Sequence, residues 1–175
     1  ILSRGLGDVY KRQPLALQVV GEIARSDEPD PERGLTEVSL GEMTDFTYDI
    51  HAQFNNVSQR GFDALRIRTG SRPSFKGLEM GDPLVAVEPS EIREEDGELV
   101  VYLPRRVTRQ TSGAVRVVFG AEVFVFANTF AGEVFDTQSA SLPQQVEAGD
   151  ASDAIGTNNL RVLGGSEEAG DIIQN

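Results

Sequence analysis

Hydrophobic and polar residues alternate with a period of two along most of this chain. The clearest case is DFTYDIHAQF, residues 45–54, in which polar side chains separate Phe46, Tyr48 and Ile50. Because successive side chains of a strand point to opposite faces of a sheet, this pattern predicts a strand with one buried face. Eight apolar residues at such alternating positions are predicted to share one core between two sheets: Phe46, Ile50, Leu65, Ile67, Leu99, Val101, Val117 and Phe119.

Shorter apolar runs bounded by turn residues predict further strands. Gly120-Ala121 lies inside the last long run and is expected to form a bulge or kink. Residues 89–96, PSEIREED, are expected to form one helical turn with Ser90 as its N-cap. No window has the period of an amphipathic helix of three turns, so the chain is predicted to be all-β, an antiparallel β-sandwich. The further strands are expected at residues 15–23, 35–40, 84–87, 133–135 and 160–163.

The first thirteen residues, ILSRGLGDVYKRQ, do not fit this pattern. Gly5, Gly7 and Lys11 suggest a phosphate-binding loop, but such a loop needs a strand before it and a helix after it. Residues 3–13 resemble instead the translation of a transposase-end adapter used to prepare sequencing libraries. Segments of that kind are set aside in fold reasoning. We therefore expect residues 1–13 to be non-native and residues 3–13 to pack against nothing.

The rest of the chain divides into three parts. Residues 14–33 are expected to form a leading strand and an acidic linker, because SDEPDPER at residues 26–33 is rich in carboxylates and interrupted by prolines. Residues 34–163 are expected to form the β-sandwich domain. Residues 164–175 are expected to be a linker or the start of a following domain, so we expect the chain to be a fragment of a longer polypeptide.

Composition excludes several classes of function. The formal net charge of −12 argues against nucleic acid as a partner, since binding to phosphate backbones depends on clustered Lys and Arg. No run approaches the ~20 apolar residues of a membrane-spanning helix, so membrane insertion is not expected. The chain has no Cys, which excludes disulfides, thiolate metal sites and cysteine nucleophiles.

Few residues suggest catalysis. His51 is the only histidine and lies on the polar face of the strand predicted at residues 45–54. A nucleophile, base and acid triad would need it, yet Ser58 and Ser71 lie in predicted turns without the strand–turn–helix context of a nucleophile. We therefore predict no enzyme activity. Five carboxylates crowd into one predicted turn and are interpreted as a solvated acidic face: Glu91, Glu94, Glu95, Asp96 and Glu98.

Calcium is the one small ligand that the sequence leaves open. Asp150 and Asp153, in GDASDAIGTNN, are candidate metal ligands because calcium prefers carboxylate and amide oxygens. Ile155, however, stands where a helix-flanked calcium loop requires Gly. Ordinary turn formation is the alternative, and no other cofactor is predicted. A second acidic group comprises Asp27, Glu28 and Asp30.

Carbohydrate binding usually requires exposed aromatic rings, and Trp and Tyr suit it best. The chain has no Trp, and Tyr48 shares the predicted buried face with Phe46 and Ile50. Phe75 and Phe130 are the aromatic residues in predicted turns, and they are the ones expected to be exposed.

Three stretches, GFDALRIRT at 61–69, LVVYLPRRV at 99–107 and the run at 115–136, resemble immunoglobulin-like sandwich modules of large secreted or surface proteins of bacteria. The resemblance implies an extracellular or cell-surface location and a noncatalytic structural or adhesive module. Its partners would be neighbouring domains of the same polypeptide, and it carries over no functional residue. The alternative is a ligand-binding module for carbohydrate or calcium, with the protein or glycan ligand unknown.

Overall fold

The computed structural model describes residues 17–28, 36–54, 60–69, 71–111, 114–123, 130–148 and 160–163. A helix of the length and apolarity needed to cross a bilayer is absent from these ranges. They contain twelve strands: β1 (Leu17–Arg25), β2 (Thr36–Ser39), β3 (Met43–Phe54), β4 (Phe62–Arg68), β5 (Ser74–Gly81), β6 (Val85–Ala86), β7 (Glu91–Glu95), β8 (Glu98–Val107), β9 (Ala114–Glu122), β10 (Ala131–Phe135), β11 (Gln144–Ala148) and β12 (Leu160–Leu163).

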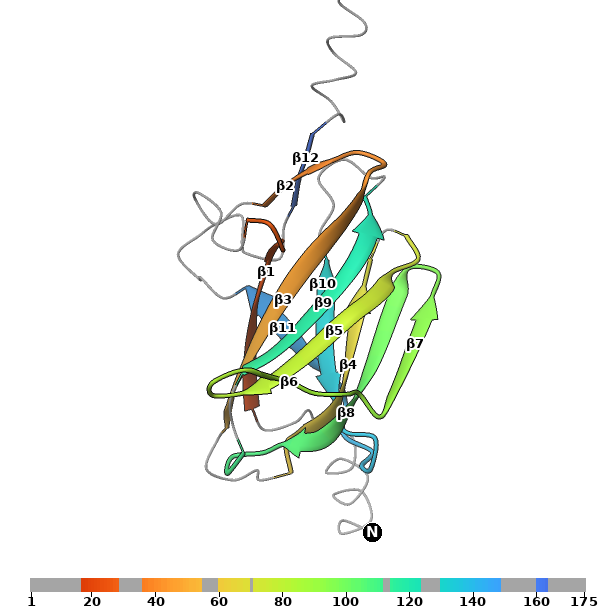
Figure 1. The fold of residues 1–175 in the computed structure, drawn as a ribbon. Helices are drawn as coiled ribbons and strands as arrows, with labels where there is room; N and C mark the ends of the chain where they lie inside the picture. Colours follow the sequence, from red (N-terminus) through yellow and green to blue (C-terminus); the bar gives the residue numbers. More distant parts are fainter. Residues whose placement is uncertain are drawn as a thin grey trace, which may run out of the picture.

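Ten of these strands form one sheet, in the order β6-β5-β9-β3-β1-β11-β10-β4-β8-β7, and β12 pairs with β2 in a small parallel sheet. The large sheet curls, so that its two halves face each other across a core (Figure 1). We call strands β6, β5, β9, β3 and β1 the β9 half, and strands β11, β10, β4, β8 and β7 the β4 half. The all-β sandwich predicted from the sequence is confirmed. Within the large sheet, neighbouring strands are antiparallel except for the pair β1 and β11.

The core lies where the alternating pattern placed it. All eight predicted core residues are buried, each at most 1% exposed, on the inward faces of β3, β4, β8 and β9. Burial of their apolar area, at about 25 cal/mol per Å², is the main term that stabilises the sandwich.

Phe130 corrects the prediction of an exposed turn aromatic. It precedes β10 and is fully buried, with its ring 4.9 Å from that of Phe46 and 5.6 Å from that of Phe119. Phe75 belongs to β5 rather than to a turn, and it is partly buried against the same core. Both rings pack against the core because removal of their apolar surface from water is favourable, even though turn residues stand near them in the sequence.

Tyr48 packs against both halves of the sandwich. A Cβ atom placed on Gly21 in β1 would lie 2.5 Å from Cε1 of Tyr48, and one placed on Gly132 in β10 would lie 2.6 Å from its hydroxyl oxygen. Those distances are shorter than a carbon atom can approach. The two glycines therefore make the space that the buried tyrosine ring fills.

β1 is an inner strand of the sandwich. The sequence placed this leading strand ahead of a domain starting at residue 34, but β1 pairs with β3 over its whole length, from Leu17↔Phe54 to Arg25↔Phe46. On its other side it pairs with β11. β1 therefore belongs to the sandwich.

Three strands were not predicted. Residues 91–95, expected in a helical turn, form β7, which pairs antiparallel with β8. β5 and β11 were not expected at all. The bulge expected at Gly120-Ala121 is also absent, because β9 keeps its register with β3 through Glu122. The irregularity lies instead in the neighbouring strand β5, between Phe75 and Gly77.

Candidate functional site

The structure separates the residues that a catalytic triad would need. His51 is exposed on the outer face of β3, opposite Val20 in β1 and Ala114 in β9. Ser71 accepts a hydrogen bond at its Oγ from the backbone N–H of Glu122, at 2.9 Å. Its hydroxyl therefore fixes the chain beside β9. Ser58 lies outside the described residues.

The predicted acidic face splits into two kinds of carboxylate. Glu91 and Glu95 are exposed on β7, as expected. Glu94 instead accepts a hydrogen bond from the backbone N–H of Phe75, at 2.7 Å, across the gap between β7 and β5. Glu98 lies 3.4 Å from the guanidinium of Arg66. These carboxylates diverge into separate contacts, so they do not form a catalytic pair.

The calcium prediction at Asp150 and Asp153 falls outside the described residues and stays a prediction. In the second acidic group, the carboxylate of Asp27 accepts hydrogen bonds from the guanidinium of Arg25, which lowers the pKa of Asp27. Within the described ranges, no three His, Asp or Glu side chains gather closely enough to hold a metal ion.

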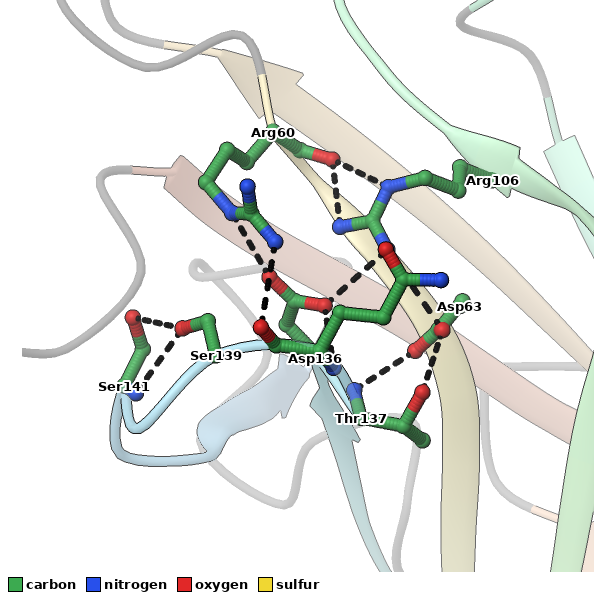
Figure 2. Close-up of polar contacts among 8 residues, drawn as sticks. Arg60, Asp63, Arg106, Asp136, Thr137, Ser139 and Ser141 are labelled. Atoms are coloured by element: carbon green, nitrogen blue, oxygen red, sulfur yellow. Dashed lines mark hydrogen bonds and ion pairs between the residues drawn. The ribbon is translucent and has the colours of Figure 1, made fainter.

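A polar network that the sequence did not reveal ties the start of β4 to β8 and to the turn after β10 (Figure 2). At its centre, the side chain of Asp136 is fully buried. Its carboxylate lies 2.9 Å from Nε of Arg60 and 3.0 Å from Nη1 of Arg106. Arg106 also donates to the carbonyl of Arg60, at 2.8 Å and 3.0 Å, and lies 3.4 Å from Asp63. Thr137 donates to Asp63 through its N–H at 2.8 Å.

The electrostatics of this network hold Asp136 in its charged form. Burial alone would raise the pKa of Asp136, but hydrogen bonds from Arg106, from the backbone N–H of Gln138 and from Arg60 outweigh it and lower the pKa. A carboxylate held ionised by two arginines is poorly suited to carry a proton in acid–base catalysis. The network acts as a brace between strands.

A second network covers the outer face of the β4 half. The guanidinium of Arg66 in β4 binds the buried carboxylate of Glu133 in β10, and Arg68 lies 3.6 Å from the same carboxylate. Gln145 in β11 donates to Glu133 at 3.1 Å. Together with Glu98 of β8, these residues connect four neighbouring strands.

Two aromatic rings meet on this face. Tyr102 and Phe135 lie edge to face, with centroids 6.3 Å apart. The guanidinium of Arg66 lies 4.9 Å from the ring centre of Phe135, and that of Arg93 lies 5.6 Å from the ring centre of Tyr102. A sugar would stack on the ring faces that these guanidinium groups cover. The pair is therefore built as a packed layer rather than as an open carbohydrate platform.

An open depression of about 470 Å³ lies where β1 ends beside the turn between β2 and β3. Two of its three carboxylates have partners: Asp27 pairs with Arg25, and Asp45 lies 3.7 Å from Nζ of Lys76. Among the described residues, its acidic side chains do not form a cluster that could hold a metal ion. The lining residues are Arg25, Ser26, Asp27, Glu42, Met43, Thr44 and Asp45.

No family model and no curated protein matches the chain. Among solved structures, it is similar to a DUF4466 family protein from Parabacteroides merdae, with 9% identity, a TM-score of 0.45, and 84% of this chain and 46% of that one covered. It is also similar to a C-terminal fragment of the major pilin GBS80 of Streptococcus agalactiae, with 10% identity, a TM-score of 0.44, and 83% of this chain and 55% of that one covered. A third similar structure is the cohesin module of a family 33 glycoside hydrolase from Clostridium perfringens, with 11% identity, a TM-score of 0.39, and 83% of this chain and 96% of that one covered. The chain spans less than half of the DUF4466 protein. TM-scores below 0.5 assign it no function and no functional residue.

Proposed function

We propose that this chain is a noncatalytic structural module that carries tension within a larger exported protein at a bacterial cell surface. Its partners are then the neighbouring domains of the same polypeptide. One observation carries the proposal: the first described strand, β1, and the last strand of the large sheet, β11, lie side by side and run parallel.

This pairing determines how the sandwich responds to pulling. Val19, Val20 and Gly21 stand opposite Val146, Glu147 and Ala148. Since the strands are parallel, the start of β1 and the end of β11 lie at opposite ends of the pair. Tension applied at those two points shears the strands along each other. All the hydrogen bonds between them are then loaded at once, whereas an antiparallel hairpin pulled at its open end breaks one pair at a time.

The buried carboxylates of the module also resist displacement of its strands. Asp136 and Glu133 are the two buried carboxylates among the described residues. Glu133 binds Arg66 of β4, and Asp136 binds Arg106 of β8 and Arg60, which precedes β4. Removal of one partner of a buried ion pair is strongly destabilising, because the remaining charge is left without compensation. These groups therefore hold strands in place.

Single-molecule pulling tests the proposal, and the absence of Cys allows attachment at chosen positions. The variant Gln18→Cys/Glu147→Cys applies tension along the pair of β1 and β11. The matched control, Glu88→Cys/Arg105→Cys, opens the antiparallel hairpin of β7 and β8 from its exposed end. We expect the first geometry to need the higher unfolding force at the same pulling speed, with equal thermal stability of both variants. An equal or lower force in the first geometry would overturn the proposal.

The ligand-binding alternative keeps its own test. Calcium bound by Asp150 and Asp153 to the folded state alone would stabilise the protein by about 2.7 kcal/mol at a hundredfold excess over Kd. Thermal unfolding with calcium and with chelator measures this shift, and Asp150→Ala/Asp153→Ala should abolish it. Equal unfolding midpoints in calcium and chelator would remove calcium from consideration.

A further inference from the structure

β7 forms one margin of the ten-stranded sheet (Figure 1). It pairs with β8 on one side, and no strand in the described part of the chain pairs with its other side. The opposite margin, β6, has only two residues, Val85–Ala86, and follows Pro83. Edge strands carry unpaired backbone donors and acceptors that another strand can bind. β7 is the longer of the two edges.

The outer face of β7 carries charges of alternating sign. Glu91, Arg93 and Glu95 stand in register opposite Tyr102, Val100 and Glu98 of β8. All three side chains on β7 are exposed. Any strand added at this edge would therefore place its own alternate residues beside a negative, a positive and a negative charge.

This pattern opposes pairing with a second copy. Two antiparallel β7 strands that overlap fully would place Arg93 against Arg93, and Glu91 against Glu95 at both ends. Like charges directly opposite each other destabilise a strand pair. A register shifted by two residues would bring Arg93 beside a glutamate, but it overlaps only three residues of each strand.

A hydrogen bond fixes the position of β7, and an exposed apolar side chain lies beside its free edge. The carboxylate of Glu94 points from β7 toward β5 and accepts the N–H of Phe75 at 2.7 Å, which fixes the edge strand against the other half of the sandwich. Ile92, on the same side of β7, is 38% exposed. An added strand would cover part of that apolar surface.

We propose that β7 accepts an antiparallel strand from a partner in which alternate residues are basic, acidic and basic, and that its own charges prevent two copies of this chain from pairing there. The partner is recognised by backbone hydrogen bonds and by three opposite-charge pairs across the edge. This inference is independent of the tension-carrying function proposed above.

A charge-swapped copy of the chain supplies the partner strand for the test. The variant Glu91→Lys/Arg93→Glu/Glu95→Lys presents lysine, glutamate and lysine on the same edge. Mixed with the unaltered protein, it should give a species of twice the monomer mass in sedimentation equilibrium, while each protein alone stays monomeric. High salt should weaken the mixed species, because it rests on exposed charge pairs.

A matched control separates pairing from a change of net charge. Glu42→Lys changes the net charge by the same amount as the swap but lies on the turn before β3, so its mixture should stay monomeric. A second variant, Arg93→Thr/Glu95→Lys, complements itself and should form a dimer alone, which keeps the test valid if the triple variant does not fold. Monomers only, from folded proteins in both experiments, would overturn the proposal, as would dimers of the unaltered chain that β7 substitutions abolish.

Discussion

The two sandwich halves use arginine in different ways. On the β9 half, Arg116 of β9 forms a two-pronged pair with Asp49 of β3, at 2.5 Å and 2.9 Å, and lies 3.9 Å from Glu79 of β5. All three side chains remain about one-third exposed. On the β4 half, arginines close over buried carboxylates and over aromatic rings. They are Arg60, Arg66, Arg68, Arg93 and Arg106.

The difference implies that similar ion pairs contribute different amounts to the free energy of unfolding, according to their burial. The pair on the β9 half is partly exposed, where salt bridges contribute about 0–1 kcal/mol. Asp136 and Glu133 are buried, so loss of a partner there leaves a charged group poorly solvated. The β4 half should depend on its charges, and the β9 half mainly on its core.

The largest expected effect contrasts one carboxylate from each half of the sandwich. Asp136→Ala should lower the free energy of unfolding by about 3 kcal/mol, because two arginines lose their buried partner. Asp49→Ala should cost about 1 kcal/mol or less. Urea unfolding of both variants measures the two values. Similar losses would show that burial does not distinguish the ion pairs of the two halves.

The same contrast has a pH dependence. The pKa of Asp136 is lower in the folded state than its ordinary value, so its ion pairs add stability above that ordinary value. This contribution is lost as the pH falls through the folded-state pKa. Stability of the native protein and of Asp136→Asn should therefore differ most at neutral pH and converge in acid. A constant difference across the pH range would contradict the assignment.

Tyr48 supplies a comparison in which the two halves should behave alike. Gly21→Ala in β1 and Gly132→Ala in β10 each place a methyl group against the same buried ring. Each should cost about 2 kcal/mol, the usual scale for overpacking a core. Thermal unfolding of the two variants checks this. A large loss for Gly132→Ala alone would mean that the β4 half is less tolerant of any change, charged or not.

The smallest expected effect concerns the geometry of arginine. Arg66→Lys keeps the positive charge but removes the planar group that binds Glu133 and covers Phe135, and it should cost about 1 kcal/mol. Arg116→Lys on the other face has no ring to uncover and should cost less. Chemical denaturation of the two lysine variants, with matched buffers, ranks them. The reverse ranking would contradict the role given to Phe135.

The inner faces were predictable from sequence because burial imposes the alternation. Phe46, Ile50 and Phe119 sit at every second position and are all buried. β7 was not predicted for the opposite reason: this edge strand carries charged residues where inner strands carry apolar residues. β5 was hidden by its irregularity at Phe75 and Gly77, which breaks the period of two.

The polar networks could not be predicted in the same way. Arg60 and Asp136 meet although 76 positions separate them in the chain, and no local pattern relates them. The one available signal was the turn sequence DTQS that begins at Asp136, which is typical of a carboxylate capping backbone N–H groups. That signal predicts a turn, but it does not predict the two arginines that make the carboxylate a brace.

The pairing of β1 with β11 also bears on how the chain folds as it is synthesised. β1 is the first of the described strands to leave the ribosome, and its partner Val146 follows only after most of the sandwich has been made. Contacts between residues so far apart in sequence form slowly, since a long loop must close first. β1 and β3 can associate early, but the edge of β1 that β11 covers stays unpaired until β11 has been synthesised. The sandwich is therefore expected to close only after the residues of β11 have been synthesised.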